Sequence, residues 1–188
     1  MSDLNLMIGF SSSHGWLSGM IRWFLKSRIS HTFLSIDAFG ARLTIGADEG
    51  GLNWCEVSRF KKTNQVMLVL RPRQNIDTVF DWFVQKHAGA EYDWISAGIG
   101  GIRTRIKWMW YWFKHWLRKG VKKESLNCAE VTGLLLERAG YPFAVGLDTE
   151  ITTAQELMFM CLRKENRDHF EIIWIDPKLK ADYPDLKL

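Results

Sequence analysis

One cysteine and one histidine stand where they could together form a thiol nucleophile. Cys128 follows Asn127, at the point where a polar stretch turns into an apolar helical pattern. His31 opens the strand-like run 31–37, far earlier in the chain. A cysteine in contact with a histidine supplies a thiolate and a general base and acid, which is the chemistry of acyl transfer. The sequence therefore predicts Cys128 as nucleophile and His31 as general base and acid.

The residues around Cys128 predict a helix that begins there. Asn127 is a favourable N-cap, and Glu130 three positions on completes a capping-box pattern. The unpaired N–H groups and the positive end of the helix dipole favour the thiolate over the thiol. Val131 and Leu135 fall on the same helical face as Cys128, so its side chain is expected on the buried side. Asn127 and the first N–H groups are then expected beside an oxyanion.

A predicted β-hairpin determines what lies opposite His31. The runs 31–37 and 42–47 alternate as strands, and pairing Asp37 with Arg42 sets their register. Asp48 then stands directly across from His31, with Glu49 one residue further. Asp48 is the predicted orienting group for the imidazole, with Glu49 as its substitute.

Both chemical residues also have a structural interpretation. A buried cysteine commonly packs as a small apolar side chain, and a histidine at a strand edge is often a surface residue. Cys55 and Cys161 are expected to be structural in this sense. Of the other histidines, His14 is the best alternative base, because it follows the first predicted strand.

The remaining elements predict one α+β domain over residues 1–176, followed by a polar tail at 177–188. Further strands are expected at 4–10, 66–70 and 171–175, and helices at 16–27, from Asn75, over 103–119 and after Thr152 and Thr153.

Four short segments occur in the order found in circularly permuted NlpC-type papain-like cysteine hydrolases. The chain resembles the YiiX-like group of this family, which is related to the lecithin:retinol acyltransferase-like proteins. Residues 30–36 resemble its histidine strand and 127–131 its nucleophile helix. Residues 92–94 resemble the tyrosine-bearing segment before that helix, and 151–157 its terminal motif.

The resemblance implies a permuted papain-like fold, a small antiparallel sheet packed against helices, with Cys128 and His31 across a cleft. Tyr92 would lie near the oxyanion. Such enzymes cleave amide or ester bonds in peptides, murein fragments or lipids through a thioester, without a metal or organic cofactor. One departure concerns the third catalytic residue, because Gly46 stands where the family has a polar side chain. The alternatives are that Asp48 or Glu49 substitutes for it, that the site is a dyad, or that the chain is an inactive member. The presence of both Cys128 and His31 favours activity.

A segment rich in tryptophan and basic residues precedes the nucleophile helix. Residues 103–123 hold eight basic residues and no acidic one, leaving 17 basic against 21 acidic elsewhere. As a helix, this segment would form a lid or part of the core, a protein-docking surface, or a contact with an anionic membrane. A nucleic-acid surface is the least favoured alternative. The residues expected to make a membrane or partner contact are Trp108, Trp112, Trp116, Lys107, Lys114 and Arg118.

Composition indicates the class of protein and its compartment. Three cysteines without CxxC spacing argue against a disulfide framework and against a zinc site. The first residues lack the pattern of a secretory signal, and no uncharged run reaches the length of a membrane span. We therefore expect a cytoplasmic enzyme, peripheral to a membrane, that acts on a peptide or lipid. The alternative is a catalytically inactive binding module that uses residues 103–123.

Overall fold

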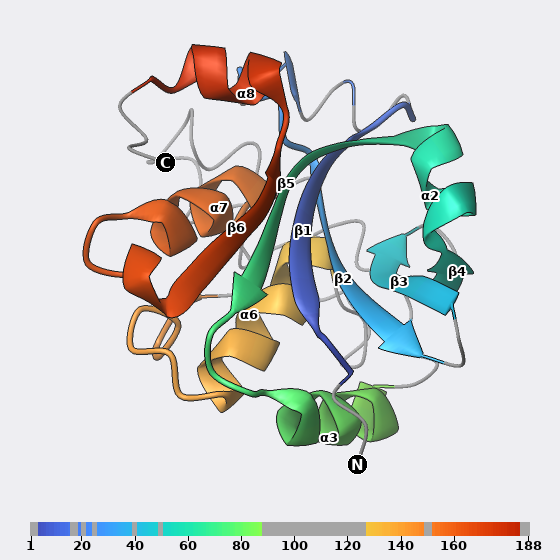
Figure 1. The fold of residues 1–188 in the computed structure, drawn as a ribbon, viewed down its shortest axis with the longest axis vertical. Helices are drawn as coiled ribbons and strands as arrows, with labels where there is room; N and C mark the ends of the chain where they lie inside the picture. Colours follow the sequence, from blue (N-terminus) through green and yellow to red (C-terminus); the bar gives the residue numbers. More distant parts are fainter. Residues whose placement is uncertain are drawn as a thin grey trace, which may run out of the picture.

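The computed structural model describes residues 4–15, 26–38, 41–48, 51–87, 127–148 and 152–184, together with Gly19, Arg22 and Trp23. Within these ranges, six strands form one antiparallel sheet in the order β4-β3-β2-β1-β5-β6 (Figure 1). The strands are β1 (Met7–Ser13), β2 (His31–Ala38), β3 (Ala41–Asp48), β4 (Gly51–Glu56), β5 (Asn64–Pro72) and β6 (Phe170–Ile175). The coarse α+β class predicted from the sequence is confirmed.

The β2–β3 hairpin has the register that the sequence predicts. Asp37 pairs with Arg42, and the ladder continues to Leu34 opposite Ile45. The Arg42 guanidinium binds the Asp37 carboxylate at 2.7 Å across the same pair. This register determines which residues of β3 lie beside the start of β2, where His31 stands.

Two helices cover one face of the sheet, α6 (Cys128–Arg138) and α7 (Ala154–Leu162). A short helix, α2 (Val57–Thr63), lies beside β3 and β4, and α3 (Asp77–His87) lies at the end of the sheet near the N-terminus (Figure 1). The 3-10 turn η2 (Arg167–His169) leads into β6, and α8 (Pro177–Asp182) follows it.

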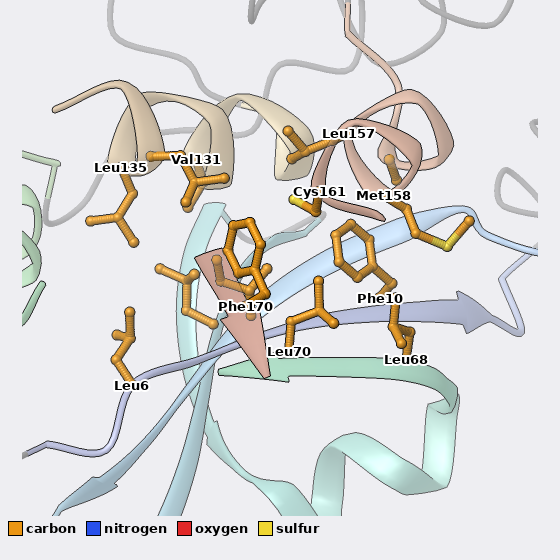
Figure 2. Packing of buried hydrophobic residues seen from close by; sticks show 14 of the residues in the cluster. Leu6, Phe10, Leu68, Leu70, Val131, Leu135, Leu157, Met158, Cys161 and Phe170 are labelled. Atoms are coloured by element: carbon orange, nitrogen blue, oxygen red, sulfur yellow. The ribbon is translucent and has the colours of Figure 1, made fainter. Parts of the chain in front are cut away.

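The main hydrophobic core fills the space between the sheet and helices α6 and α7. Alternate residues of the strands point to this face, and the apolar stripe of each helix meets them (Figure 2). Full burial of each such side chain stabilises the fold by about 1.5–3 kcal/mol. Members of this core include Leu6, Phe10, Leu68, Leu70, Val131, Leu135, Leu157, Met158, Cys161 and Phe170.

A smaller aromatic cluster lies on the opposite face of the sheet. The Phe33 and Phe60 rings are 4.5 Å apart, so α2 packs on the side of β2 that carries the odd-numbered residues. The Phe33 ring lies across Gly9 on the neighbouring strand, where an added Cβ would come within 2.0 Å of it. His31 has the same parity as Phe33 and stands beside this cluster.

Three elements differ from the sequence-based expectation. The strand β4 and the helix α2 were not predicted, and the expected polar tail instead begins with α8. Asp176 caps α8, Pro177 occupies its first turn, and Leu179 is fully buried against the core. Most of the predicted helix 16–27 and all of residues 88–126 lie outside the described residues.

Candidate active site

Cys128 is the first residue of α6, as the sequence predicts. The Asn127 side chain accepts a hydrogen bond from the backbone N–H of Glu130 at 2.9 Å. The Glu130 carboxylate in turn accepts from the Asn127 N–H at 3.2 Å, which completes the capping box. Cys128 is only 7% exposed. The predicted cleft residue Asn127 is buried as well, with its side chain engaged in the cap.

The side chains of His31 and Cys128 meet, although they are far apart in the sequence. Burial raises the pKa of the Cys128 thiol, but the charge of His31 and a hydrogen bond from it lower that pKa. The backbone N–H groups of Thr32 and Ala129 also hydrogen-bond to the sulfur and lower its pKa further. The net result is a thiol pKa below its ordinary value in a buried site.

Thr32 connects the histidine strand to the start of the cysteine helix. Its hydroxyl donates to the backbone carbonyl of Cys128 and lies 3.1 Å from the Thr132 hydroxyl. All three residues are buried. Because strand residues alternate between faces, Thr32 holds α6 on one face while His31 projects at the edge toward the other. Sequence reasoning missed this residue, although its position next to His31 was a signal.

The His31 imidazole lies over Gly46 of β3. A Cβ placed at Gly46 would be 3.1 Å from Nε2 and 3.5 Å from Cε1 of the ring. The Phe60 ring, 6.1 Å away between centroids, flanks the imidazole. The position at which the resembled family carries its third polar residue is therefore the position that the imidazole itself covers.

Ser11 is the residue of β1 that pairs with His31. It is fully buried, and its hydroxyl has no hydrogen-bond partner within the described part of the chain. The sequence offered no signal for it, since Ser11 is one of three consecutive serines.

The structure leaves the predicted third residue without a test. The described β2–β3 ladder ends at Leu34 and Ile45, and the Asp48 backbone pairs with Gly51 of β4. The Asp48 side chain, Glu49 and Tyr92 lie outside the described residues. The same holds for the predicted contact residues Trp108, Trp112, Trp116, Lys107, Lys114 and Arg118.

The other two cysteines differ from Cys128 in their surroundings. Cys161 is fully buried in the apolar core, and this burial raises its pKa far above the ordinary value. Cys55 is half-buried in β4, with its sulfur 3.1 Å from the Thr44 hydroxyl. The alternative base His14 is exposed after β1. Neither Cys55 nor Cys161 has a described histidine contact.

Comparison with known proteins returned no match, either to a protein-family model or to a curated protein. Within the ranges that the structure describes, no group of three or more His, Cys, Asp or Glu side chains could hold a metal ion. No described helix is long and apolar enough to cross a membrane.

Proposed function

We propose that the chain is a cysteine-dependent hydrolase or acyltransferase that cleaves an amide or ester bond through a thioester on Cys128. The observation that carries this proposal is the contact of His31 with the Cys128 sulfur at the start of α6, a contact that lowers the pKa of the thiol. Burial alone would favour the neutral thiol, so the effect of His31 and the two N–H groups exceeds that of burial. A structural cysteine needs no such surroundings, and Cys161, whose pKa burial raises, has no described histidine contact.

The reaction follows from the positions of these groups. The Cys128 thiolate adds to the substrate carbonyl carbon, and the charge moves to the carbonyl oxygen. The capping box uses the N–H groups of Asn127 and Glu130 and does not involve the N–H of Cys128 at the start of α6, so in this proposal the Cys128 N–H donates to the oxyanion. The His31 imidazolium then protonates the leaving amine or alcohol as the C–N or C–O bond breaks.

The second half of the reaction regenerates the Cys128 thiolate and the His31 imidazolium. His31, now neutral, takes a proton from water or from an acceptor alcohol or amine, which attacks the thioester carbonyl. The C–S bond breaks, and the sulfur leaves as the thiolate that the imidazolium again stabilises. Attack by water makes the protein a hydrolase, and attack by another nucleophile makes it an acyltransferase.

The fold proposed for this chemistry is the permuted papain-like fold of NlpC-type enzymes. Three features support it: an antiparallel sheet, a histidine at the start of β2, and a cysteine at the start of a helix that follows strands β1 to β5 in sequence. In this proposal the substrate is a peptide, a murein fragment or a lipid, and the location is cytoplasmic. Contact of residues 103–123 with an anionic membrane stays a prediction.

Acylation by an activated ester tests the proposal. The protein would be incubated with p-nitrophenyl acetate at neutral pH, and acetylated peptides would be mapped by mass spectrometry. We expect acetyl transfer to Cys128, with no acetylation of Cys161 because it is buried. In His31→Ala, acetylation of Cys128 should slow at least about tenfold, as general acid–base groups contribute a hundredfold or more.

The Cys55→Ser variant is the matched control, because it removes a half-buried thiol that has no described histidine contact. Its acetylation of Cys128 should equal that of the wild type. Equal acetylation of Cys55 and Cys128, unchanged by His31→Ala, would contradict the proposal. That outcome would leave a binding module as the better account of the chain.

A further inference from the structure

Arg22 is a charged side chain at the end of β1 whose described contacts are all neutral. Its Nη1 donates to the Ser12 hydroxyl and to the Ser13 carbonyl, the latter at 2.7 Å. The side chain is half-buried. The other arginines with described side-chain hydrogen bonds differ, since each binds a carboxylate: Arg28 with Asp182, Arg42 with Asp37, and Arg71 with Glu171.

Ser12 and Ser13, the residues that bind Arg22, lie at the same end of the sheet as His31 and Cys128. Ser12 and Ser13 directly follow Ser11, the residue that pairs with His31. Ser30, which precedes His31, donates its N–H to the Ser11 carbonyl at 3.0 Å. The Ser30 hydroxyl accepts from the Ser13 N–H at 3.1 Å. The guanidinium is thus connected through β1 to Ser11, which pairs with His31, and to Ser30, which precedes it.

Strand geometry indicates how far the residues that bind Arg22 lie along β1 from the contact with Cys128. Phe10 pairs with Thr32, the residue whose hydroxyl binds the Cys128 carbonyl. Ser12 lies two residues further along β1, which is about 7 Å of extended chain. A substrate held with its carbonyl at the sulfur would need only a few bonds to reach this end of β1.

A half-buried guanidinium without a negative partner among the described residues favours an anionic ligand. It carries five N–H donors in a planar fork, and only those on Nη1 have partners within the described part of the chain. Carboxylate and phosphate oxygens match this fork and neutralise its charge. Ser12 and Ser13 hold the group in place but supply no negative charge to balance it.

We infer that Arg22 forms a subsite for an anionic group, a carboxylate or a phosphate, on the substrate whose amide or ester bond Cys128 attacks. This inference rests on the proposed function and narrows its substrate class to negatively charged acyl compounds. Arg22 is the residue that binds the anion, and Ser12 and Ser13 are the residues that position it.

Paired alkylating probes test the subsite without knowledge of the natural substrate. Each pair joins an anion to its neutral analogue: bromoacetylglycine with its amide, and bromoacetyl-γ-aminobutyric acid with its amide. The measured quantity is the ratio of the Cys128 alkylation rates, anionic over neutral. This ratio cancels any general change in the reactivity of the thiol.

For at least one probe length, we expect Arg22→Gln to lower this ratio about tenfold, as the loss of one charge-assisted contact implies. Arg22→Lys, which keeps the charge, should retain part of the preference and guards against a folding defect in the Gln variant. Arg73→Gln is the matched control, because Arg73 is an exposed arginine that follows the last residue of β5. This end of β5 pairs with the start of β1, away from Ser12 and Ser13. Its ratio should equal that of the wild type.

Competing ions identify the anion. Added phosphate or acetate, at matched ionic strength, should slow labelling of the wild type by the anionic probe. The ion that slows labelling more is the one whose chemical group Arg22 prefers. An anionic-to-neutral ratio that is the same in the wild type and Arg22→Gln for both probe lengths would overturn the subsite while leaving the thiol chemistry intact. A Cys128 that none of the probes alkylates would instead defeat the proposed function, and the subsite with it.

Discussion

The hydroxyl of Thr32 donates to the backbone carbonyl of Cys128 and thereby joins the histidine strand to the first turn of the cysteine helix. The bond is buried, and the Thr132 hydroxyl completes it at 3.1 Å. Because His31 directly precedes Thr32 in the chain, we infer that this contact helps to position the imidazole relative to the sulfur. The geometry of the site thus depends on a residue that takes no part in the proposed chemistry.

Removal of the Thr32 hydroxyl should weaken both the fold and the site. Thr32→Val keeps the shape but leaves a buried carbonyl without its donor, which lowers the free energy of unfolding by about 1–3 kcal/mol. Alkylation of Cys128 should slow as well, whereas Thr32→Ser should retain most of both properties. Urea unfolding and the rate of labelling by iodoacetamide measure the two effects.

Thr44→Val is the control for this prediction. Thr44 is also a buried strand threonine, and its hydroxyl donates to the Cys55 carbonyl at 3.1 Å. Its loss should lower stability to a similar degree without slowing the labelling of Cys128. If Thr32→Val labels as fast as Thr44→Val, the contact does not position the thiol.

Gly46→Ala should reduce reactivity without reducing stability. The new Cβ would stand 3.1 Å from Nε2 of His31, so the imidazole must shift by a few tenths of an ångström. A displacement of this size should slow acylation of Cys128 roughly threefold to tenfold. Replacing a strand glycine with alanine otherwise stabilises by about 0.5–1 kcal/mol. Thermal unfolding and acetylation kinetics separate the two effects.

Gly9→Ala provides the contrast within the same sheet. Its Cβ would come within 2.0 Å of the Phe33 ring, so overpacking should destabilise the fold by about 1–3 kcal/mol. Equal loss of stability in both alanine variants would show that Gly46 is needed for packing and not for the placement of the imidazole.

The stability of the fold should depend on pH through Cys128. Since its pKa is lowered in the folded state, the folded protein loses this proton more readily than the unfolded chain. The thiolate therefore contributes stability that is complete above the ordinary thiol pKa and is lost as pH falls through the lowered value. The free energy of unfolding of the wild type, minus that of Cys128→Ser, should rise with pH across this window. A difference that falls over this window would reverse the predicted sign.

The two capping boxes should differ in function but not in strength. Asn127 caps α6 and Thr153 caps α7 with the same reciprocal pattern. Alanine at either position should lower the free energy of unfolding by about 1 kcal/mol. Only Asn127→Ala should also slow the alkylation of Cys128, because it loosens the N–H groups around the sulfur. Equal labelling rates in the two variants would mean that the cap of α6 serves stability alone.

Local signals in the sequence predicted much of the fold. The capping pattern at Asn127 and the alternation of 31–37 each specify one element, and the pair Asp37 and Arg42 specified the register correctly. The strand β4 and the helix α2 escaped prediction because Trp54 and Cys55 show no clear alternation, and the helix that follows is only seven residues long. The helix α8 within the predicted polar tail was missed because one buried residue, Leu179, within a charged run carries little weight.

The site was only partly open to prediction. The sequence indicated that Cys128 and His31 could form a pair, since each begins an element, and the structure brings them together. It could not indicate that the imidazole lies over Gly46, because a ring's direction depends on three-dimensional packing. The contacts of Arg22 with Ser12 and Ser13 likewise depend on three-dimensional packing.

Ultraviolet titration of the thiolate tests the central claim most directly. The absorbance of the wild type, minus that of Cys128→Ser, would be followed against pH in the presence and absence of the His31→Ala substitution. The account predicts a thiolate step below the pKa of an ordinary thiol that moves to higher pH when His31 is lost. A step at or above the ordinary value, unmoved by His31→Ala, would contradict it.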